Sequence, residues 1–181
     1  LTPTTTITTT STSTSTTSTT LPTDVISGRK LTIIEARSAS KGGRAIVVSR
    51  DPTIGFGVAL DDPTLTGGDL RIVSLAGAFD EQRVLPSTGW KAVKRGFKYK
   101  DDEGALIALK IGKRLKVVLR GPDFPLGDEE PTPIVIALRI GGRRLCMEFR
   151  TATVKTSRRR LVAKDAAPPF ACNEPVTPPG P

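Results

Sequence analysis

The sequence predicts an all-β protein, a β-sandwich or jelly roll that carries an extended N-terminal donor strand. Short runs rich in Val, Ile and Leu recur along the 181 residues, and none of them has a helical period. Seventeen Gly and fifteen Pro separate these runs, as expected for short elements joined by turns. Because 37% of the residues are apolar, two sheets can enclose a core.

The first predicted strands are residues 30–35 (KLTIIE), 44–49 (RAIVVS) and 69–75 (DLRIVSL). The turn-forming runs SASKGG and DDPTLTGG separate them. Residues 90–99 (WKAVKRGFKY) alternate apolar and basic side chains, and Gly96 predicts a bulge within that strand. We expect the single tryptophan, at the start of this run, to anchor the core.

Two hairpins are predicted in the second half of the chain. Residues 105–111 and 114–119 flank the turn Gly112-Lys113, and residues 133–140 and 143–149 flank the turn Gly141-Gly142. Residues 159–163 (RRLVA) supply a last strand.

The composition changes sharply near Asp24. Residues 1–23 contain fourteen Thr and four Ser and no charged residue, whereas residues 24–175 form the predicted β-domain and residues 176–181 a Pro-rich tail. Thr is β-branched and favours extended strands. Twenty extended residues span roughly 65 Å, which exceeds the diameter of about 40 Å expected for such a domain. The segment is therefore long enough to reach a neighbouring copy of the chain.

We therefore expect the N-terminal segment to add a strand to a neighbouring subunit, which makes the chain a structural subunit of a head-to-tail extracellular filament. The expected partners are copies of the same chain. Ile7 is the candidate anchor because it is the one bulky apolar residue within residues 4–20. The donor strand is assigned to Thr4, Thr5, Thr6, Ile7, Thr8, Thr9, Thr10, Ser11, Thr12, Ser13 and Thr14.

Two alternatives stay open for the same segment. It folds back on its own sheet, or it is a stalk with O-linked glycans on Thr and Ser. The start at Leu1 fits a processed, secreted chain, although a fragment would look the same.

Net charge is +9, and none of it lies in residues 1–23, so the β-domain is basic. One interpretation is a solvated outer sheet face, and the other is attraction to a polyanion. The densest basic cluster comprises Arg143, Arg144, Arg158, Arg159 and Arg160, which we expect to face one another in one hairpin sheet. The alternative function is thus a basic secreted adhesin, or a polyanion- or polysaccharide-binding module with a glycosylated stalk. Nucleic acid is not favoured as a partner, because aromatics for base stacking are scarce.

Catalytic and metal-binding patterns are missing from the sequence. It has no His and only two Cys, which removes the commonest general base and leaves too few ligands for a zinc site. The acidic groups at residues 61–69 and 128–130 lack the ligand spacing of a calcium loop. We therefore expect no enzyme activity and no cofactor. No apolar run approaches the roughly 20 residues of a membrane span.

Cys146 and Cys172 pair most simply with each other in an exported protein, and two inert buried thiols are the alternative. A disulfide that closes this loop would add about 3 kcal/mol to stability.

Residues 85–121 resemble a repeat-like unit of uncharacterised secreted proteins of environmental bacteria. The unit contains a Leu-Pro-x-x-x-Trp-Lys segment, a Gly-Tyr-x-Tyr-Lys-Asp segment and a Gly-Lys-Leu-Leu-Lys strand, which correspond to residues 85–91, 96–101 and 112–116. The resemblance extends over most of residues 28–172. It implies an exported β-domain in which Cys146 and Cys172 pair, while a second pair, which falls near Ala105 and Leu119, is absent here. The donor-strand arrangement also resembles pili, as an architectural analogy.

Overall fold

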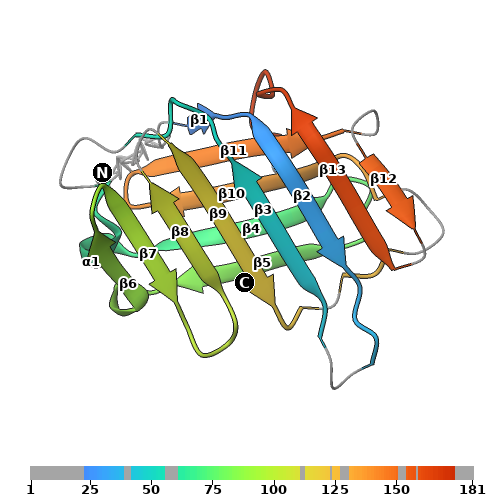
Figure 1. Ribbon diagram of the computed structural model, residues 1–181, viewed down its shortest axis with the longest axis horizontal. Coiled ribbons are helices and arrows are strands. Elements are labelled where there is room, and N and C mark those ends of the chain that lie inside the picture. The colour runs from blue at the N-terminus through green and yellow to red at the C-terminus, as the bar shows by residue number, and fades with distance from the viewer. Residues whose placement is uncertain are drawn as a thin grey trace, which may run out of the picture.

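The structure, a computed structural model, describes residues 23–38, 42–55, 61–110, 113–122, 124–126, 131–150, 154–157 and 159–173, the backbone alone for residues 154–157. Within these residues the chain forms two sheets packed face to face as a sandwich, so the predicted fold class is confirmed. In Figure 1 the larger sheet lies in front, and its strands cross over those of the smaller sheet behind.

The smaller sheet has five strands in the order β1-β11-β10-β4-β5. Their bounds are β1 Thr23–Val25, β4 Gly68–Ser74, β5 Asp80–Leu85, β10 Ile134–Ile140 and β11 Arg143–Phe149. Neighbouring strands are antiparallel, except that β1 runs parallel to β11.

The larger sheet has eight strands in the order β12-β13-β2-β3-β9-β8-β7-β6, all antiparallel to their neighbours. Their bounds are β2 Gly28–Ile34, β3 Arg44–Ser49, β6 Trp90–Val93, β7 Gly96–Lys100, β8 Leu106–Lys110, β9 Arg114–Arg120, β12 Val154–Ser157 and β13 Arg160–Ala166.

Alternation along the strands builds the core. Leu31 and Ile33 of β2, and Val47 of β3, are fully buried between the sheets, as are Leu70 and Leu138 from the opposite sheet. The approach is closest at Gly28, where a Cβ atom would lie 2.4 Å from the Phe149 ring of the other sheet. Gly28 therefore leaves the room that this aromatic ring occupies.

The predicted bulge at Gly96 is wrong, because residues 90–99 belong to two strands, β6 and β7, joined by a tight turn. Arg95 adopts a positive φ of 64° in this turn, which a bulge within one strand would not need. Trp90 is buried as expected, and its ring lies 5.2 Å from that of Tyr99, its partner across the hairpin.

The other two predicted hairpins are confirmed as β8-β9 and β10-β11. Strands β1, β5 and β12 and the short helices α1 (Pro63–Thr66) and η2 (Ser87–Gly89) were not predicted. Strand β1 begins at Thr23, one residue before the expected start of the domain. Asp62, one of the acidic residues weighed as a calcium ligand, caps α1, because its Oδ1 accepts a hydrogen bond from the Thr64 N–H.

Candidate functional site

The outer face of the eight-stranded sheet is strongly basic. Along β9 the side chains of Leu115, Val117 and Leu119 enter the core, so the alternate residues of the strand point outward. Strands β3, β7 and β8 alternate in the same way. Ten of the outward basic residues, which we call the cationic face, are Lys30, Arg44, Lys91, Lys98, Lys100, Lys110, Arg114, Lys116, Arg120 and Lys164. Arg160 of β13 also points outward but has an interaction of its own and is not counted among them.

Strand register arranges these cations in rows that run across the sheet. The longest row passes through Lys164, Lys30, Val48, Lys116, Ala108, Lys98 and Lys91, one residue from each of seven adjacent strands. With neighbouring strands about 4.8 Å apart, this row extends over roughly 29 Å. A linear polyanion that crosses the strands would meet five lysines along it.

An apolar row lies beside this lysine row. It consists of Val162, Thr32, Ile46, Val118 and Leu106. Val118 is buried although it points away from the core, because long neighbouring side chains cover it. The face therefore offers aliphatic surface as well as positive charge.

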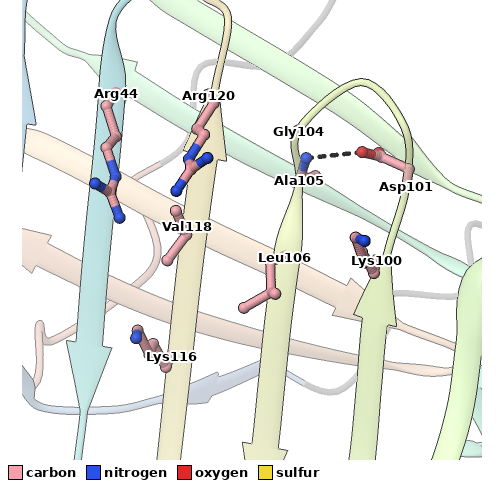
Figure 2. A pocket seen from close by; sticks show the side chains of 9 residues that line it. All are labelled: Arg44, Lys100, Asp101, Gly104, Ala105, Leu106, Lys116, Val118 and Arg120. Carbon is pink, nitrogen blue, oxygen red and sulfur yellow. Dashed lines mark hydrogen bonds between the residues drawn. The ribbon is translucent and has the colours of Figure 1, made fainter.

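Two hollows mark this face. One has a volume of about 270 Å³ and lies over β3, β9, β8 and the β7-β8 turn; it is lined by Arg44, Lys100, Asp101, Gly104, Ala105, Leu106, Lys116, Val118 and Arg120 (Figure 2). The other, of about 330 Å³, is lined by Thr88, Gly89, Lys91, Lys98 and Lys100. Lys100 lines both hollows, so they form one continuous basic surface.

Among the described residues, no acidic side chain forms a salt bridge with any member of the cationic face. Two carboxylates of the nearby acidic turn have other partners: Glu103 pairs with Arg83, and Asp101 accepts hydrogen bonds from the Ala105 N–H at 2.7 Å and from the Tyr99 hydroxyl at 3.3 Å. Burial, and then the Asp101 carboxylate, raise the pKa of Tyr99 to about 12, so this hydroxyl keeps its proton.

The opposite outer face, on the five-stranded sheet, is covered and charge-paired. Arg71 binds Asp80 through two hydrogen bonds of 2.6 and 2.9 Å, and Arg139 pairs with Asp69. The hydrogen bond from Arg71 is the main cause of a lowered Asp80 pKa. Residues 167–173, the C-terminal strap, follow β13 and contact this face through Cys172 and Asn173.

A disulfide holds the C-terminal strap in place. Cys146 and Cys172 are bonded, which confirms the predicted pair, and Cys172 packs against Val73 and Val135. Asn173 also donates a hydrogen bond of 3.1 Å to Glu148. The strap thus gives the five-stranded sheet a second, small apolar cluster on its outer side.

The structure separates the predicted arginine cluster. Arg143 and Arg144 lie on β11 in the five-stranded sheet, whereas Arg159 and Arg160 lie at the start of β13 in the eight-stranded sheet, so the expected hairpin between them is wrong. Arg143 pairs with Asp24 and lies 3.9 Å from Asp61. Arg158 and the whole predicted donor strand, residues 4–14, lie outside the described residues.

Sequence reasoning anticipated a charged outer sheet face but did not assign the residues of the cationic face, although their signal is present. Residues 98, 100, 110, 114, 116 and 120 repeat a basic side chain at even spacing, which places them on one side of their strands. Only the register between strands brings them together with Arg44 and Lys30, which are distant in the sequence.

Within the described part of the chain, no three His, Cys, Asp or Glu residues are grouped so that they could hold a metal ion. A search of the same residues found no helix with the length and hydropathy of a membrane span. Comparison with protein families, curated proteins and solved structures found no match to this chain. The resemblance to secreted bacterial repeat proteins therefore stays a prediction.

Proposed function

We propose that this protein is an extracellular binding module that holds a linear acidic polysaccharide against the cationic face. The observation that carries the proposal is the row of lysines from Lys164 to Lys91, which no described acidic residue neutralises. Packing so many like charges on one sheet without partners is unfavourable for folding alone. A bound polyanion removes that penalty.

The apolar row supports a carbohydrate rather than a nucleic acid. Single-stranded nucleic acids are usually held by aromatic side chains that stack on bases. Trp90 and Tyr99 are buried under the sheet, and Phe97 packs toward the same core, so the described part of the cationic face offers no such platform. Ile46, Val118 and neighbouring aliphatic groups are instead suited to the C–H surface of a sugar ring.

The disulfide supports the proposed location. Such bonds persist in oxidising compartments, which fits a protein that works outside the cell.

A binding series tests the proposed function. The full chain is titrated at several salt concentrations with heparin, with a polyuronate, with double-stranded DNA and with neutral dextran. We expect the two acidic polysaccharides to bind with an affinity that falls linearly with the logarithm of salt concentration, and dextran not to bind. Tighter binding of DNA than of either polysaccharide would reassign the face to nucleic acid, and no binding of any polyanion would refute the proposal.

We also propose, as a second function, the filament predicted from the N-terminal segment. The supporting observation is that β1, which directly follows this segment, lies at one edge of the five-stranded sheet, and β5 lies at the other. Val84 on β5 is 72% exposed. A donor strand that leaves beside β1 and pairs with β5 of the next copy would repeat head to tail.

Electron microscopy of negatively stained full chain, beside a version that lacks residues 1–22 and therefore keeps β1, tests the filament. Filaments from the full chain alone are expected, and Ile7→Asp should weaken them while the domain stays folded. Monomers from both versions would rule the filament out.

A further inference from the structure

The hollow over β3 and β9 contains an opposed pair of arginines. Arg44 and Arg120 are direct register partners at adjoining ends of the two antiparallel strands. Figure 2 shows the two guanidinium groups extending side by side over the sheet, with Lys116 further along β9 and Lys100 beyond Leu106 on β7. Directly opposed like charges destabilise a strand pair, so this arrangement needs an explanation.

One hydrogen-bond donor of this pair lacks an acceptor within the part of the chain that the structure describes. The Nε atom of Arg44 is buried and has no acceptor among the described residues. A buried donor without an acceptor is costly. The one carboxylate that lines the hollow, Asp101, points at the β7-β8 turn and binds the Ala105 N–H, as Figure 2 shows. Among the described residues, the hollow therefore holds four cationic side chains and one buried donor that this carboxylate does not reach.

The backbone holds both arginines in place. Gly43, next to Arg44, donates a hydrogen bond of 2.9 Å to Pro122 O and accepts one of 3.2 Å from Gly121, next to Arg120. The segments before β3 and after β9 approach so closely that a Cβ atom on Gly42 would lie 2.4 Å from Gly121 O. The two guanidinium groups are consequently presented from a fixed strand pair, which lowers the entropic cost of ligand binding.

We propose that this hollow is a discrete oxyanion subsite that binds one carboxylate or sulfate substituent of the polysaccharide. The planar guanidinium groups of Arg44 and Arg120 donate paired hydrogen bonds to its oxygens, as arginine does with carboxylates and other oxyanions. The ammonium groups of Lys100 and Lys116 complete the charge, and the partly exposed Leu106 contacts the sugar ring. The inference rests on the proposed function for the identity of the polysaccharide. The hollow binds the free oxyanion even when no polysaccharide carries it.

A matched pair of substitutions, one in each sheet, tests the subsite. Arg120→Lys changes the hollow, and Arg139→Lys makes the same change on β10 of the five-stranded sheet, away from the cationic face. Both variants keep the net charge, so long-range attraction is equal and only the planar, paired donation differs. Arg44→Lys is a second variant within the hollow in case Arg120→Lys alters folding.

The full-length wild type and each variant are titrated with inorganic sulfate and, separately, with glucuronate, while the Nε–H resonances of the arginines are followed by NMR. We expect both probes to shift the Arg44 Nε–H signal. Arg120→Lys should weaken binding on the order of tenfold or more, because a charge-assisted hydrogen bond is lost, and Arg139→Lys should leave it unchanged. The stronger of the two probes identifies the substituent.

Equal affinities in Arg120→Lys and Arg139→Lys, or a wild type whose Arg44 signal does not move, would overturn the subsite. Failure of the subsite and failure of the proposed function are distinguishable. Heparin binding that persists without sulfate binding in the hollow would leave the polyanion function in place and remove the subsite. Sulfate binding in the hollow without any polysaccharide binding would keep the subsite and remove the polysaccharide.

Discussion

The two outer faces of this sandwich carry charge in different ways. On the five-stranded sheet, Arg71 and Arg139 each have a carboxylate partner, and a disulfide-bonded strap covers the apolar centre. On the eight-stranded sheet, Arg29 pairs with Asp165, but the lysines and arginines of the cationic face stand in rows without acidic partners among the described residues. The first arrangement stabilises the fold. The unpaired cations of the eight-stranded sheet do not stabilise the fold, and we therefore assign them to binding.

The largest expected effect concerns the covered face. Replacing both Cys146 and Cys172 with Ser should lower the free energy of unfolding by about 3 kcal/mol, because the unfolded chain is no longer cross-linked. Urea denaturation measures the loss, and reduction of the wild type should reproduce it. Heparin affinity under folding conditions should not change; a parallel loss of affinity would mean that the two faces are not independent.

The next largest expected effect is on the pH dependence of stability and concerns Asp51, which follows the end of β3. Burial alone would raise its pKa, but hydrogen bonds from the Ser27 N–H and from the N–H and hydroxyl of Thr53 outweigh burial and lower it to about 2. The charged form is thus stabilised by roughly 2 kcal/mol above pH 4, and this contribution is lost as the pH falls toward 2.

Asp51→Asn should therefore be less stable than the wild type at pH 7 and equally stable near pH 2. Denaturation at both pH values measures this. A constant difference between the two proteins across that range would show that Asp51 acts through packing rather than charge.

Removing the same number of positive charges from each face in turn tests the comparison between the faces. Lys98→Gln/Lys116→Gln and Arg71→Gln/Arg139→Gln each remove two positive charges, the first pair from the cationic face and the second from the five-stranded sheet. We expect heparin affinity to fall on the order of tenfold in the first variant and to change little in the second. Equal losses measured by titration calorimetry would indicate that net charge alone, and not the face, attracts the polyanion.

The smallest effect has opposite signs on the two faces. Arg120→Gln removes a directly opposed like charge and should stabilise the protein by about 0.5 kcal/mol at low salt. Arg71→Gln breaks its pair with Asp80 and should destabilise it by a similar amount. Thermal unfolding at low and high salt reports both, since screening should shrink the two shifts. Shifts of the unfolding temperature with the same sign in both variants would contradict the proposed difference between the two faces.

Much of the fold follows from the sequence because strand alternation and Gly-containing turns are local signals. Residues 44–49 and 143–149 coincide with β3 and β11. Strand β5 (Asp80–Leu85) was missed because its run DEQRVL is mostly polar, as befits an edge strand with one covered face. The turn at Arg95 was mistaken for a bulge because Gly96 permits both.

The candidate site was harder to predict, because it depends on the pairing of strands that are distant in the sequence. Arg44 and Arg120 are far apart along the chain and become neighbours only through the β3-β9 register. Sequence proximity instead pointed to Arg143, Arg144 and the run from residue 158 to 160, which the two sheets separate. The Cys146–Cys172 bond was predictable because only one pairing of two cysteines exists.

Amide chemical-shift mapping with a short heparin oligosaccharide tests the central claim most directly. The account predicts that the largest shifts occur along β3, β9, β8 and β7, at and beside Arg44, Lys116, Leu106 and Lys98, and that β4, β10 and β11 show none. Shifts centred on the five-stranded sheet, or no shifts at a concentration that saturates other heparin-binding proteins, would contradict it.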